Sequence, residues 1–583
     1  MTNSLVTLAL PILGTVSVPR IIEFPYTGYS AYTTNVLVSL VALGIFALIS
    51  PFVILAVYRK HKSVYKNIPG PRPKTWIAGN LLDLIFQKSL IMFEQWVQEY
   101  GSTHKWAGIM GVERLTTVDP GAINFILQNV KLFTKPKGQM LALKRFVGDG
   151  LVTNDGADHR RQRRALNPAF SPGHIRELGP VFHRHAENFK SRLDGILDGT
   201  VNDECILLED NLKFRDEKNG IGLDMLALSE RSAADTVASA MFGFEFDFVN
   251  NPDQPIIPAL RNASYVAIND LDRALAELWE TLPWMDKIHT PGWRTGNAAK
   301  LATWKYGKEL VEKKQKEQSE IGDFEGKDVI SLLAHSAGND PQLREDLKLT
   351  STEALNQFST AFLAGTGTTG GALSWAWYHL AKNPKVQQKL RDELNSLGTD
   401  EPDSDSLHAL PYLEKFTHEL MRLAAPVPLV VREPLEDLVM PVSRPIEGTD
   451  GTKLDSILVS KGTMILIPIQ TVNRDKRIWG EDAHEFNPDR YDVNGLPAEK
   501  IVSSYGNILS FIGGLRNCIG FRFSMAEFKH TIFSVLRHYE FEELPSSPEI
   551  AAHLPIAVTR PHVVGMKGEN SYKMPLVVRR IDH

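Results

Sequence analysis

Apolar residues recur every three or four positions along most of the chain, which is the spacing of one buried face of an α-helix. The segments 383–397, 412–423 and 521–539 show this helical spacing most clearly. Short apolar runs typical of strands are fewer, and residues 463–469 form the clearest one. The pattern therefore predicts a mainly α fold with small β-sheets.

One apolar stretch is much longer than a core helix needs. Residues 36–57 carry no charge, and at about 1.5 Å per residue they are long enough to cross a bilayer core of about 30 Å. The basic cluster at 59–62 follows at once, which by the positive-inside rule places the downstream chain in the cytosol. We therefore expect a membrane-anchor region, residues 1–66, with a transmembrane helix at about 36–57, followed by one globular domain, residues 67–583.

The N-terminal region leaves two points open. A buried core helix is the alternative interpretation of residues 36–57. The shorter apolar stretch at 5–18 contains a proline and fits either a second membrane segment or a signal-like region. Beyond the anchor, the sequence I-P-G-P-R-P at 68–73 cannot continue a helix and predicts a stiff, extended spacer.

Charge and cysteine content narrow the function classes. The chain carries 64 Lys and Arg against 69 Asp and Glu, a formal net charge of −5, and no long basic tract, so nucleic acid is a poor candidate partner. It contains two cysteines, Cys205 and Cys518, which is too few for a disulfide framework or a structural zinc site. Chemistry that needs a thiolate therefore has two candidate residues.

The segment 365–370 reads G-T-G-T-T-G, a literal match to a dinucleotide-binding fingerprint. That fingerprint requires a preceding strand, whereas T-S-T-E at 350–353 is a capping box that opens a helix. The context therefore favours one long helix with a weak, glycine-rich middle, where carbonyls and hydroxyls face a ligand.

Two further segments predict a charged cluster. Glu419 and Arg422 stand three positions apart on one helix face, next to an apolar run, so burial would turn an ordinary surface pair into one that organises the fold. The segment 486–491, F-N-P-D-R-Y, predicts a turn in which Arg490 offers five hydrogen-bond donors.

The segment 511–520, F-I-G-G-L-R-N-C-I-G, is the most specific feature of the chain. Its glycines let the backbone approach a flat surface closely, and Cys518 stands just before a predicted helix, whose N-terminus stabilises a thiolate. Arg516 can neutralise an anion beside it. Most lone cysteines are inert and buried, which is the alternative, and a cysteine-protease role lacks a local histidine base.

Taken together, these segments resemble the cytochrome P450 family from about Pro69 to the C-terminus. The haem-binding loop F-x-x-G-x-R-x-C-x-G is matched at every defined position, by Phe511, Gly514, Arg516, Cys518 and Gly520. The E-x-x-R and F-x-P-x-R motifs and most of A-G-x-[D/E]-T-T are present as well. The proline-rich spacer after an anchor resembles the microsomal, eukaryotic type, and the C-terminal tail resembles fungal members.

The resemblance implies a haem b cofactor with Cys518 as the axial ligand of the iron. It implies that the haem propionates are bound by Arg516, Arg432, Arg163 and His159, where the family usually has a tryptophan in place of this histidine. It further implies that Arg490 joins Glu419 and Arg422 in a structural cluster, and that Phe511, Gly514 and Gly520 bind the haem as part of the cysteine loop.

On the oxygen side, the resemblance implies that Thr368 delivers protons, with Thr366 as a neighbour that takes part. Gly367 departs from the pattern, because the family usually has an acid there, and proton delivery would then use water or Thr366. For Thr366 and Thr369, a hydroxyl bonded back to the helix is the alternative. The implied substrate pocket is apolar, and its residues are Met140, Phe146, Phe362, Val427 and Leu429.

The function that follows is a membrane-anchored haem-thiolate monooxygenase of the endoplasmic reticulum with a cytosolic catalytic domain. Its expected partners are NADPH-cytochrome P450 reductase, O2, membrane lipid and a lipophilic substrate such as a terpenoid, steroid or polycyclic aromatic. The alternatives are a P450-type isomerase or dehydratase acting on an oxygenated substrate, which Gly367 favours, and a haem-binding protein without turnover. Arg522 and Lys529 are candidates for docking an acidic reductase surface, or ordinary exposed helix charges.

Overall fold

The chain divides into two compact units, Met1–Tyr58 and Arg59–His583. The computed structural model describes residues 39–44, 50, 62–75, 77–80, 83, 91–209, 212–254, 289–321, 326–338, 343–493, 497, 499–554 and 557–581. The segment 5–18 and most of 36–57 lie outside these residues, so the transmembrane helix and the anchor region 1–66 stay predictions. Among the helices that the described residues form, none combines the length and the hydropathy needed to span a membrane.

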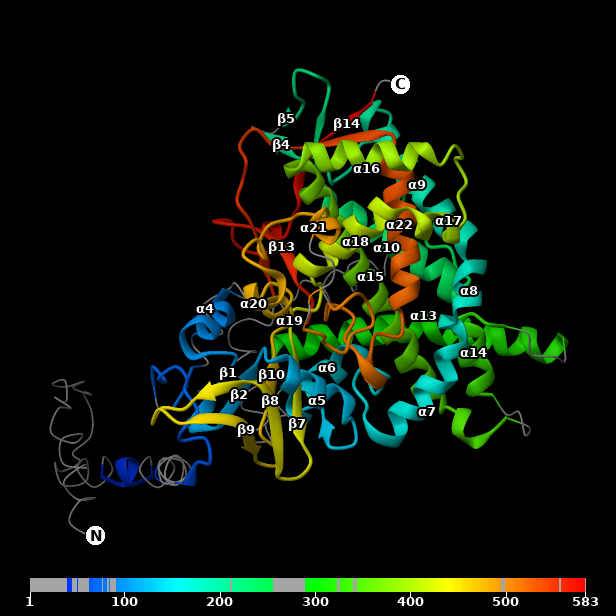
Figure 1. Ribbon diagram of the computed structural model, residues 1–583. Coiled ribbons are helices and arrows are strands. Elements are labelled where there is room, and N and C mark those ends of the chain that lie inside the picture. The colour runs from blue at the N-terminus through cyan, green and yellow to red at the C-terminus, as the bar shows by residue number, and fades with distance from the viewer. Residues whose placement is uncertain are drawn as a thin grey trace, which may run out of the picture. The chain divides into compact units, whose positions relative to one another are not determined.

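The second unit is mainly helical, as the apolar spacing predicts (Figure 1). Its longer helices are α6 (Lys137–Val147), α7 (Gly156–Leu166), α9 (Gly179–Leu197), α10 (Met225–Phe242), α13 (Pro291–Ile321), α14 (Val329–Ser336), α15 (Ser351–Lys382), α16 (Pro384–Ser396), α18 (Pro411–Leu423) and α22 (Phe521–Leu536). Shorter helices are α4 (Ile91–Tyr100), α5 (Pro120–Gln128), α8 (Pro172–Glu177), α17 (Ser404–Ala409), α19 (Ile469–Val472), α20 (Lys476–Trp479) and α21 (Arg490–Val493).

Helix α15 is the central element and packs against α10, α13, α16, α18 and α22 (Figure 1). Its start is fixed by the capping box expected from the sequence: the Glu353 N–H donates to Thr350 Oγ1 at 3.1 Å, and the Thr350 N–H donates to Glu353 Oε2 at 2.8 Å. The helix continues through the glycine-rich segment, so that segment is helical and not a phosphate loop.

The strands form small sheets. The largest has five strands in the order β1 (Thr103–Ala107), β2 (Glu113–Thr117), β10 (Ile465–Ile467), β7 (Val430–Pro434), β3 (Phe133–Thr134). Its β2–β10 pair is parallel and its other pairs are antiparallel, with Arg432 opposite Ile465. The remaining sheets are β11 (Tyr539–Glu543), β14 (Pro575–Arg580) and β6 (Ile221–Asp224); β12 (Ile550–His553) with β13 (Arg560–Val563); β8 (Leu438–Glu447) with β9 (Lys453–Val459); and β4 (Leu208–Glu209) with β5 (Leu212–Lys213).

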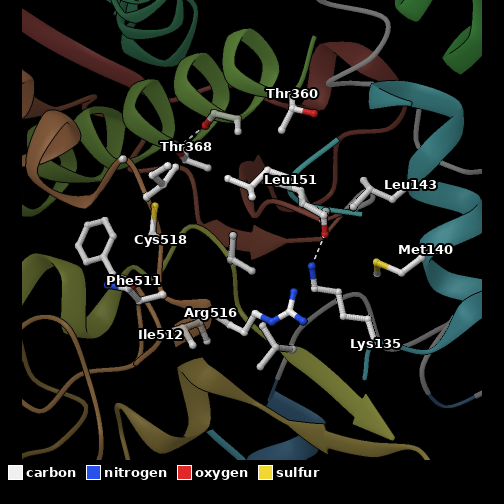
Figure 2. A pocket seen from close by; sticks show the side chains of 18 of the residues that line it. Lys135, Met140, Leu143, Leu151, Thr360, Thr368, Phe511, Ile512, Arg516 and Cys518 are labelled. Atoms are coloured by element: carbon white, nitrogen blue, oxygen red, sulfur yellow. Dashed lines mark hydrogen bonds between the residues drawn. The ribbon is translucent and has the colours of Figure 1, made fainter. Parts of the chain in front are cut away.

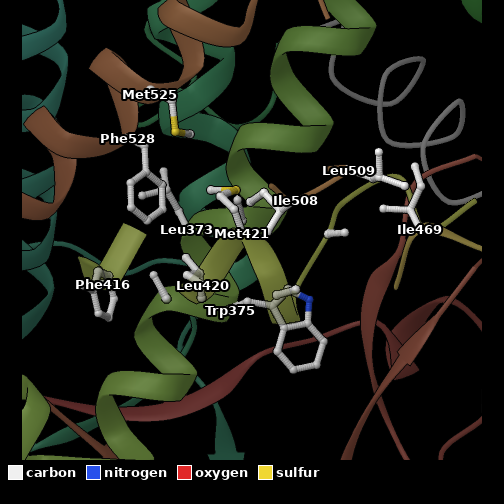
Figure 3. Close-up of a cluster of buried hydrophobic side chains, with 14 of the residues drawn as sticks. Leu373, Trp375, Phe416, Leu420, Met421, Ile469, Ile508, Leu509, Met525 and Phe528 are labelled. Carbon is white, nitrogen blue, oxygen red and sulfur yellow. The ribbon is translucent and has the colours of Figure 1, made fainter. Parts of the chain in front are cut away.

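A large apolar core joins α15, α18 and α22 (Figure 3). Leu373 from α15, Phe416 and Leu420 from α18, and Phe528 from α22 are all fully buried in it. Because these helices contribute side chains to one core, the loop that leads into α22 is held in a fixed position against the middle of α15.

The structure corrects one expectation about the chain's organisation. In the sequence, the run of charges at 313–328 indicates a solvated loop between helices, yet α13 extends to Ile321. Its charges lie along the helix with ion-pair spacing, as in the Lys308–Glu312 and Lys314–Glu317 pairs at 3.7 and 3.3 Å. Such pairs support a solvated helix, which is why a run of charges alone does not identify a loop.

Candidate active site

A cavity of about 660 Å³ lies where α15, the loop before α22 and the five-stranded sheet meet (Figure 2). Most of the residues expected at the site line it: Met140, Phe146, His159, Arg163, Thr368, Val427, Leu429, Arg432, Phe511, Arg516, Cys518 and Gly520. They come from segments almost 400 positions apart in the chain, so the fold gathers the separate motifs around one space.

Cys518 presents its side chain to this cavity, near Thr368 (Figure 2). The loop is closed by a hydrogen bond from the Cys518 N–H to the Phe511 carbonyl at 2.9 Å, and α22 begins three residues after the cysteine. Burial raises the pKa of the Cys518 thiol, while the Gly520 N–H and the charge of Arg163 act in the opposite direction. A cationic ligand at the sulfur would therefore favour the thiolate strongly.

Gly514 is required by the shape of the cysteine loop. Its φ is +70°, and a Cβ atom there would lie 2.7 Å from the carbonyl oxygen of Leu127. A side chain would thus combine backbone strain with a clash against α5. Gly514 shapes the loop from outside the cavity, whereas Gly520 lines it.

Arg163 contacts the cysteine loop itself. From α7, its Nη1 donates to the Asn517 carbonyl at 2.7 Å and its Nη2 to Asn517 Oδ1 at 2.9 Å. Asn517 directly precedes Cys518, so this arginine holds the loop in place while it also lines the cavity.

One end of the cavity is strongly cationic. Arg516, Arg432 and Lys135 meet there around a single carboxylate, Asp155, within the residues that the structure describes. Arg516 Nη2 lies 2.6 Å from Asp155 Oδ1, and Figure 2 shows its guanidinium pointing toward the amino group of Lys135. Burial lowers the pKa of Arg432 to about 10 and that of Lys135 to about 7. The surplus of buried positive charge calls for anionic groups of a ligand.

His159 lies one helical turn before Arg163 on α7 and is 6 % exposed. Burial, together with the neighbouring charges of Arg516 and Lys135, lowers the pKa of His159 to about 3. The imidazole is therefore neutral at physiological pH and has one N–H to donate toward the cavity.

On the α15 side, Thr368 Oγ1 donates to the Ala364 carbonyl at 2.7 Å, and Thr368 also lines the cavity. Thr366 does not line it: its hydroxyl oxygen is buried and finds no hydrogen-bond partner among the described residues. Gly367 faces the other way, and its carbonyl oxygen accepts a hydrogen bond from Arg560 Nη1 at 3.1 Å.

The remaining walls are mostly apolar, with Met140, Leu143 and Leu151 among them (Figure 2). Phe362 does not belong to them, contrary to the expectation. Its ring is fully buried and stacks with Phe358 at 6.2 Å between centroids. The helical period explains the error, because Phe362 lies on the face of α15 that is turned toward α10, not on the face that carries Thr368.

Glu419, Arg422 and Arg490 form one buried cluster. Arg422 Nε and Nη2 donate to the two carboxylate oxygens of Glu419, each at 2.8 Å, and Arg490 Nε donates to Glu419 Oε1 at 2.9 Å. The side chains of Glu419 and Arg422 are fully buried and that of Arg490 is 3 % exposed. Burial raises the pKa of the Glu419 carboxyl, but the bonds and charge of Arg422 outweigh it and hold the pKa below its usual range.

Arg522 and Lys529 were both candidates for docking an acidic reductase surface, and this prediction is wrong for Lys529. Arg522 is exposed, but the side chain of Lys529 is 1 % exposed. Lys529 pairs with Glu414, and its Nζ lies 2.8 Å from His408 Nδ1. Its position on the inner face of α22 follows from the helical period of the apolar residues around it.

Sequence reasoning missed Lys135 and Asp155. Asp155 immediately precedes α7, and its Oδ2 accepts hydrogen bonds from Thr134 Oγ1 at 2.7 Å and from the Lys135 N–H at 2.8 Å. The aspartate before a helix was a signal that could have marked this junction. Lys135 had no such signal. Lys135 and Lys137 flank a single proline, and nothing in the local sequence shows which of the two lysines the fold buries.

These residues fit a haem group. The Cys518 side chain faces a mostly apolar cavity. The cationic end of that cavity has more positive than negative charge, which suits the two propionate groups of haem. The family model for cytochrome P450 matches residues 69–564. The chain therefore belongs to the cytochrome P450 family, whose members bind haem through a cysteine thiolate, and it is an enzyme of the P450 monooxygenase type.

The chain is similar over nearly its full length to fungal enzymes. It is 34 % identical to cytochrome P450 monooxygenase 205 of Postia placenta, over 93 % of this chain and 98 % of the relative. It is 32 % identical to cytochrome P450 monooxygenase claU of Ampulloclitocybe clavipes, over 90 % and 94 %. It is also 32 % identical to ganoderic acid synthetase CYP5150L8 of Ganoderma lucidum, over 82 % and 88 %.

Proposed function

We propose that the protein inserts one oxygen atom of O2 into a lipophilic organic substrate, with electrons from NADPH that a cytochrome P450 reductase delivers. The observation that carries this proposal is that Cys518, Thr368 and the cationic cluster all line the cavity of about 660 Å³. Haem bound to a thiolate supplies the activation of O2 that insertion into an unactivated C–H bond requires.

Different residues around the cavity hold different parts of the haem. Cys518 is the iron ligand, and Arg163 secures the loop that carries it through Asn517. Arg432, Arg516 and Lys135 bind the propionates, with neutral His159 as a further donor. Propionate binding would raise the pKa of Lys135 again, because an anion beside the amino group offsets its burial.

Thr368 is the proton-handling group of this chain on the oxygen side. Because its hydroxyl donates to the Ala364 carbonyl, its oxygen is left to accept a hydrogen bond from water or ligand in the cavity. The apolar walls limit how much water enters the cavity, so few water molecules compete for the Thr368 hydroxyl oxygen. Thr366 has no such role, since it does not reach the cavity.

The substrate is lipophilic, of the terpenoid, steroid or polycyclic aromatic kind, because Met140, Phe146, Val427 and Leu429 all line the cavity. The name of the Ganoderma lucidum relative adds precursors of ganoderic acid to the compounds worth testing. An anchor at residues 36–57 in the endoplasmic reticulum membrane would give such substrates access from the lipid phase.

The test uses the full chain, co-expressed with a reductase in membranes. Product formation from a panel of terpenoids, steroids and polycyclic aromatics is measured under isotope-labelled O2. NADPH-dependent product that carries label from O2 is the expected result. A P450-type isomerase or dehydratase is the second candidate, because Gly367 removes the usual acid beside Thr368. Conversion of hydroperoxides without NADPH, and no labelled product, would overturn the monooxygenase proposal in favour of that candidate.

A further inference from the structure

A buried ion pair lies against the peptide group that links Gly367 to Thr368. Arg560, at the start of β13, is 2 % exposed and pairs with Glu230 of α10, whose side chain is 14 % exposed. The same guanidinium donates from Nη1 to the Gly367 carbonyl oxygen at 3.1 Å. The pair therefore touches the backbone of α15 immediately before the hydroxyl that faces the cavity.

The glycines of α15 make this contact possible. A Cβ atom at Gly367 would lie 2.9 Å from Arg560 Nη2, and one at Gly370 would lie 2.7 Å from the Cα of Glu230. Glycine in a helix costs about 0.5–1 kcal/mol relative to alanine, so two of them here need a compensating interaction. The buried pair and its bond to the backbone are that interaction.

Arg560 is itself fixed from the cavity side. The N–H of Thr559, its neighbour, donates to the Pro426 carbonyl at 2.8 Å, directly before the wall residue Val427. Leu554 and Ala557, from the same hairpin as Arg560, line the cavity. The guanidinium is thus held between the cavity wall and α15.

Building on the proposed function, we propose that Arg560 and Glu230 are positioning residues for Thr368, and that Glu230 supplies from α10 the carboxylate that position 367 lacks. A side chain at 367 would leave α15 toward the Arg560 guanidinium, the group that the Glu230 carboxylate already neutralises. Without Glu230, a buried positive charge would lie next to the Thr368 peptide, and proton supply at its hydroxyl would suffer.

The test compares Glu230→Gln with the double variant Glu230→Gln/Gly367→Asp in the haem-loaded full chain with reductase. We expect Glu230→Gln to lower the product formed per NADPH consumed by about tenfold, with more hydrogen peroxide released. Peroxide-driven turnover, haem content and substrate Kd should stay within about twofold, because those do not need proton delivery from α15. The double variant should recover most of the loss, because it returns a carboxylate to Arg560.

Asp203→Asn is the matched control. Asp203 forms a buried ion pair with Arg231, the residue next to Glu230 on α10, at 2.7 Å. If Asp203→Asn lowered the product yield per NADPH equally, or if the double variant recovered nothing, Glu230 would be merely structural and the inference wrong. If Glu230→Gln does not fold, Glu230→Asp keeps the charge and should show a smaller loss, whereas an unchanged yield would count against the inference.

The two proposals fail differently. A wild-type protein that gives no NADPH-dependent labelled product overturns the proposed function. A wild-type protein that gives labelled product, with a Glu230→Gln variant that matches its yield per NADPH, overturns the role of Glu230 alone.

Discussion

Arg163 of α7 binds Asn517, the residue directly before Cys518. Its two terminal nitrogens donate hydrogen bonds to the carbonyl oxygen and the side-chain oxygen of Asn517, at 2.7 and 2.9 Å. This contact ties a helix from the first third of the domain to the loop before α22. It also places a positive charge that acts to lower the pKa of the Cys518 thiol, against the raising effect of desolvation. The Arg163 side chain thus both holds the cysteine loop in position and favours the ionised form of Cys518.

We predict that Arg163→Leu loosens the cysteine loop. Hydrogen bonds to charged groups contribute about 1.5–3 kcal/mol each, so the thiolate-ligated form should convert more readily to a form without thiolate ligation. The absorption spectrum of the reduced carbon monoxide complex during urea titration measures this conversion. Arg164→Leu is the control, because Arg164 is exposed and pairs with Asp346 on the surface. Equal sensitivity of both variants would contradict the prediction.

The two cysteines should differ completely in their effect on the haem. Cys518→Ser removes the sulfur that lines the cavity, so the thiolate spectrum should disappear. Cys205→Ser should leave it intact, because Cys205 is 2 % exposed and its thiol is engaged by Arg231 outside the cavity. The reverse pattern would assign the iron to Cys205.

The Glu419 cluster should dominate the stability of the domain. Glu419→Gln leaves Arg422 and Arg490 buried without their shared carboxylate, a change that costs about 3–5 kcal/mol in comparable sites. The free energy of unfolding from urea titration of the haem-loaded protein measures the loss. Glu499→Gln is the control: it breaks a half-exposed pair with Arg444, and pairs of that kind contribute about 0–1 kcal/mol. Similar losses in the two variants would show that burial of the cluster is unimportant.

Gly514→Ala should weaken haem binding. The substitution adds strain at a φ of +70° and brings Cβ to 2.7 Å from the Leu127 carbonyl. Gly565→Ala is the matched control, because its φ is +90° but nothing lies within 4 Å of the added atom. We expect haem loss to apomyoglobin to accelerate for Gly514→Ala alone. If Gly565→Ala is equally damaging, the effect comes from backbone strain in general and not from the cysteine loop.

Local pattern predicted much of this molecule. Helical spacing located α16 and α18 within one residue, and the capping box located the start of α15. Motif positions also brought Cys518, Arg516 and Thr368 to one cavity. The helix assignments share a cause, because each depends on residues that lie near one another in the sequence, whereas the meeting of Cys518 and Thr368 in one cavity was expected from the family resemblance.

The features that sequence reasoning missed depend on long-range packing. Which of Lys135 and Lys137 becomes buried, and whether the face of α15 that carries Phe362 packs against α10 or lines the cavity, are decided by elements more than one hundred residues away. The pairing of Arg560 with Glu230 spans 330 positions. A single sequence carries no local sign of such a pairing, so the group beside Gly367 could not be anticipated from the residues around it.

His104 should make the domain sensitive to acid. It is fully buried in β1 and lies 3.1 Å, through Nδ1, from the Gly101 carbonyl. Burial lowers the pKa of His104 from 6.5 to about 4, although the Gly101 bond acts against this. Between those values the unfolded chain binds a proton that the folded chain rejects. Stability is therefore present above about pH 6.5 and is lost as the pH falls toward about 4.

We expect this group to remove roughly 2 kcal/mol of unfolding free energy between about pH 7.5 and about pH 5, and His104→Gln to flatten the profile by that amount. Urea midpoints of the haem-loaded protein across that range measure the slope. His484→Gln, at a half-exposed histidine, is the control for loss of an imidazole. An unaltered slope in His104→Gln would mean that the folded protein accommodates the imidazolium, and that the buried site is wetter than its packing implies.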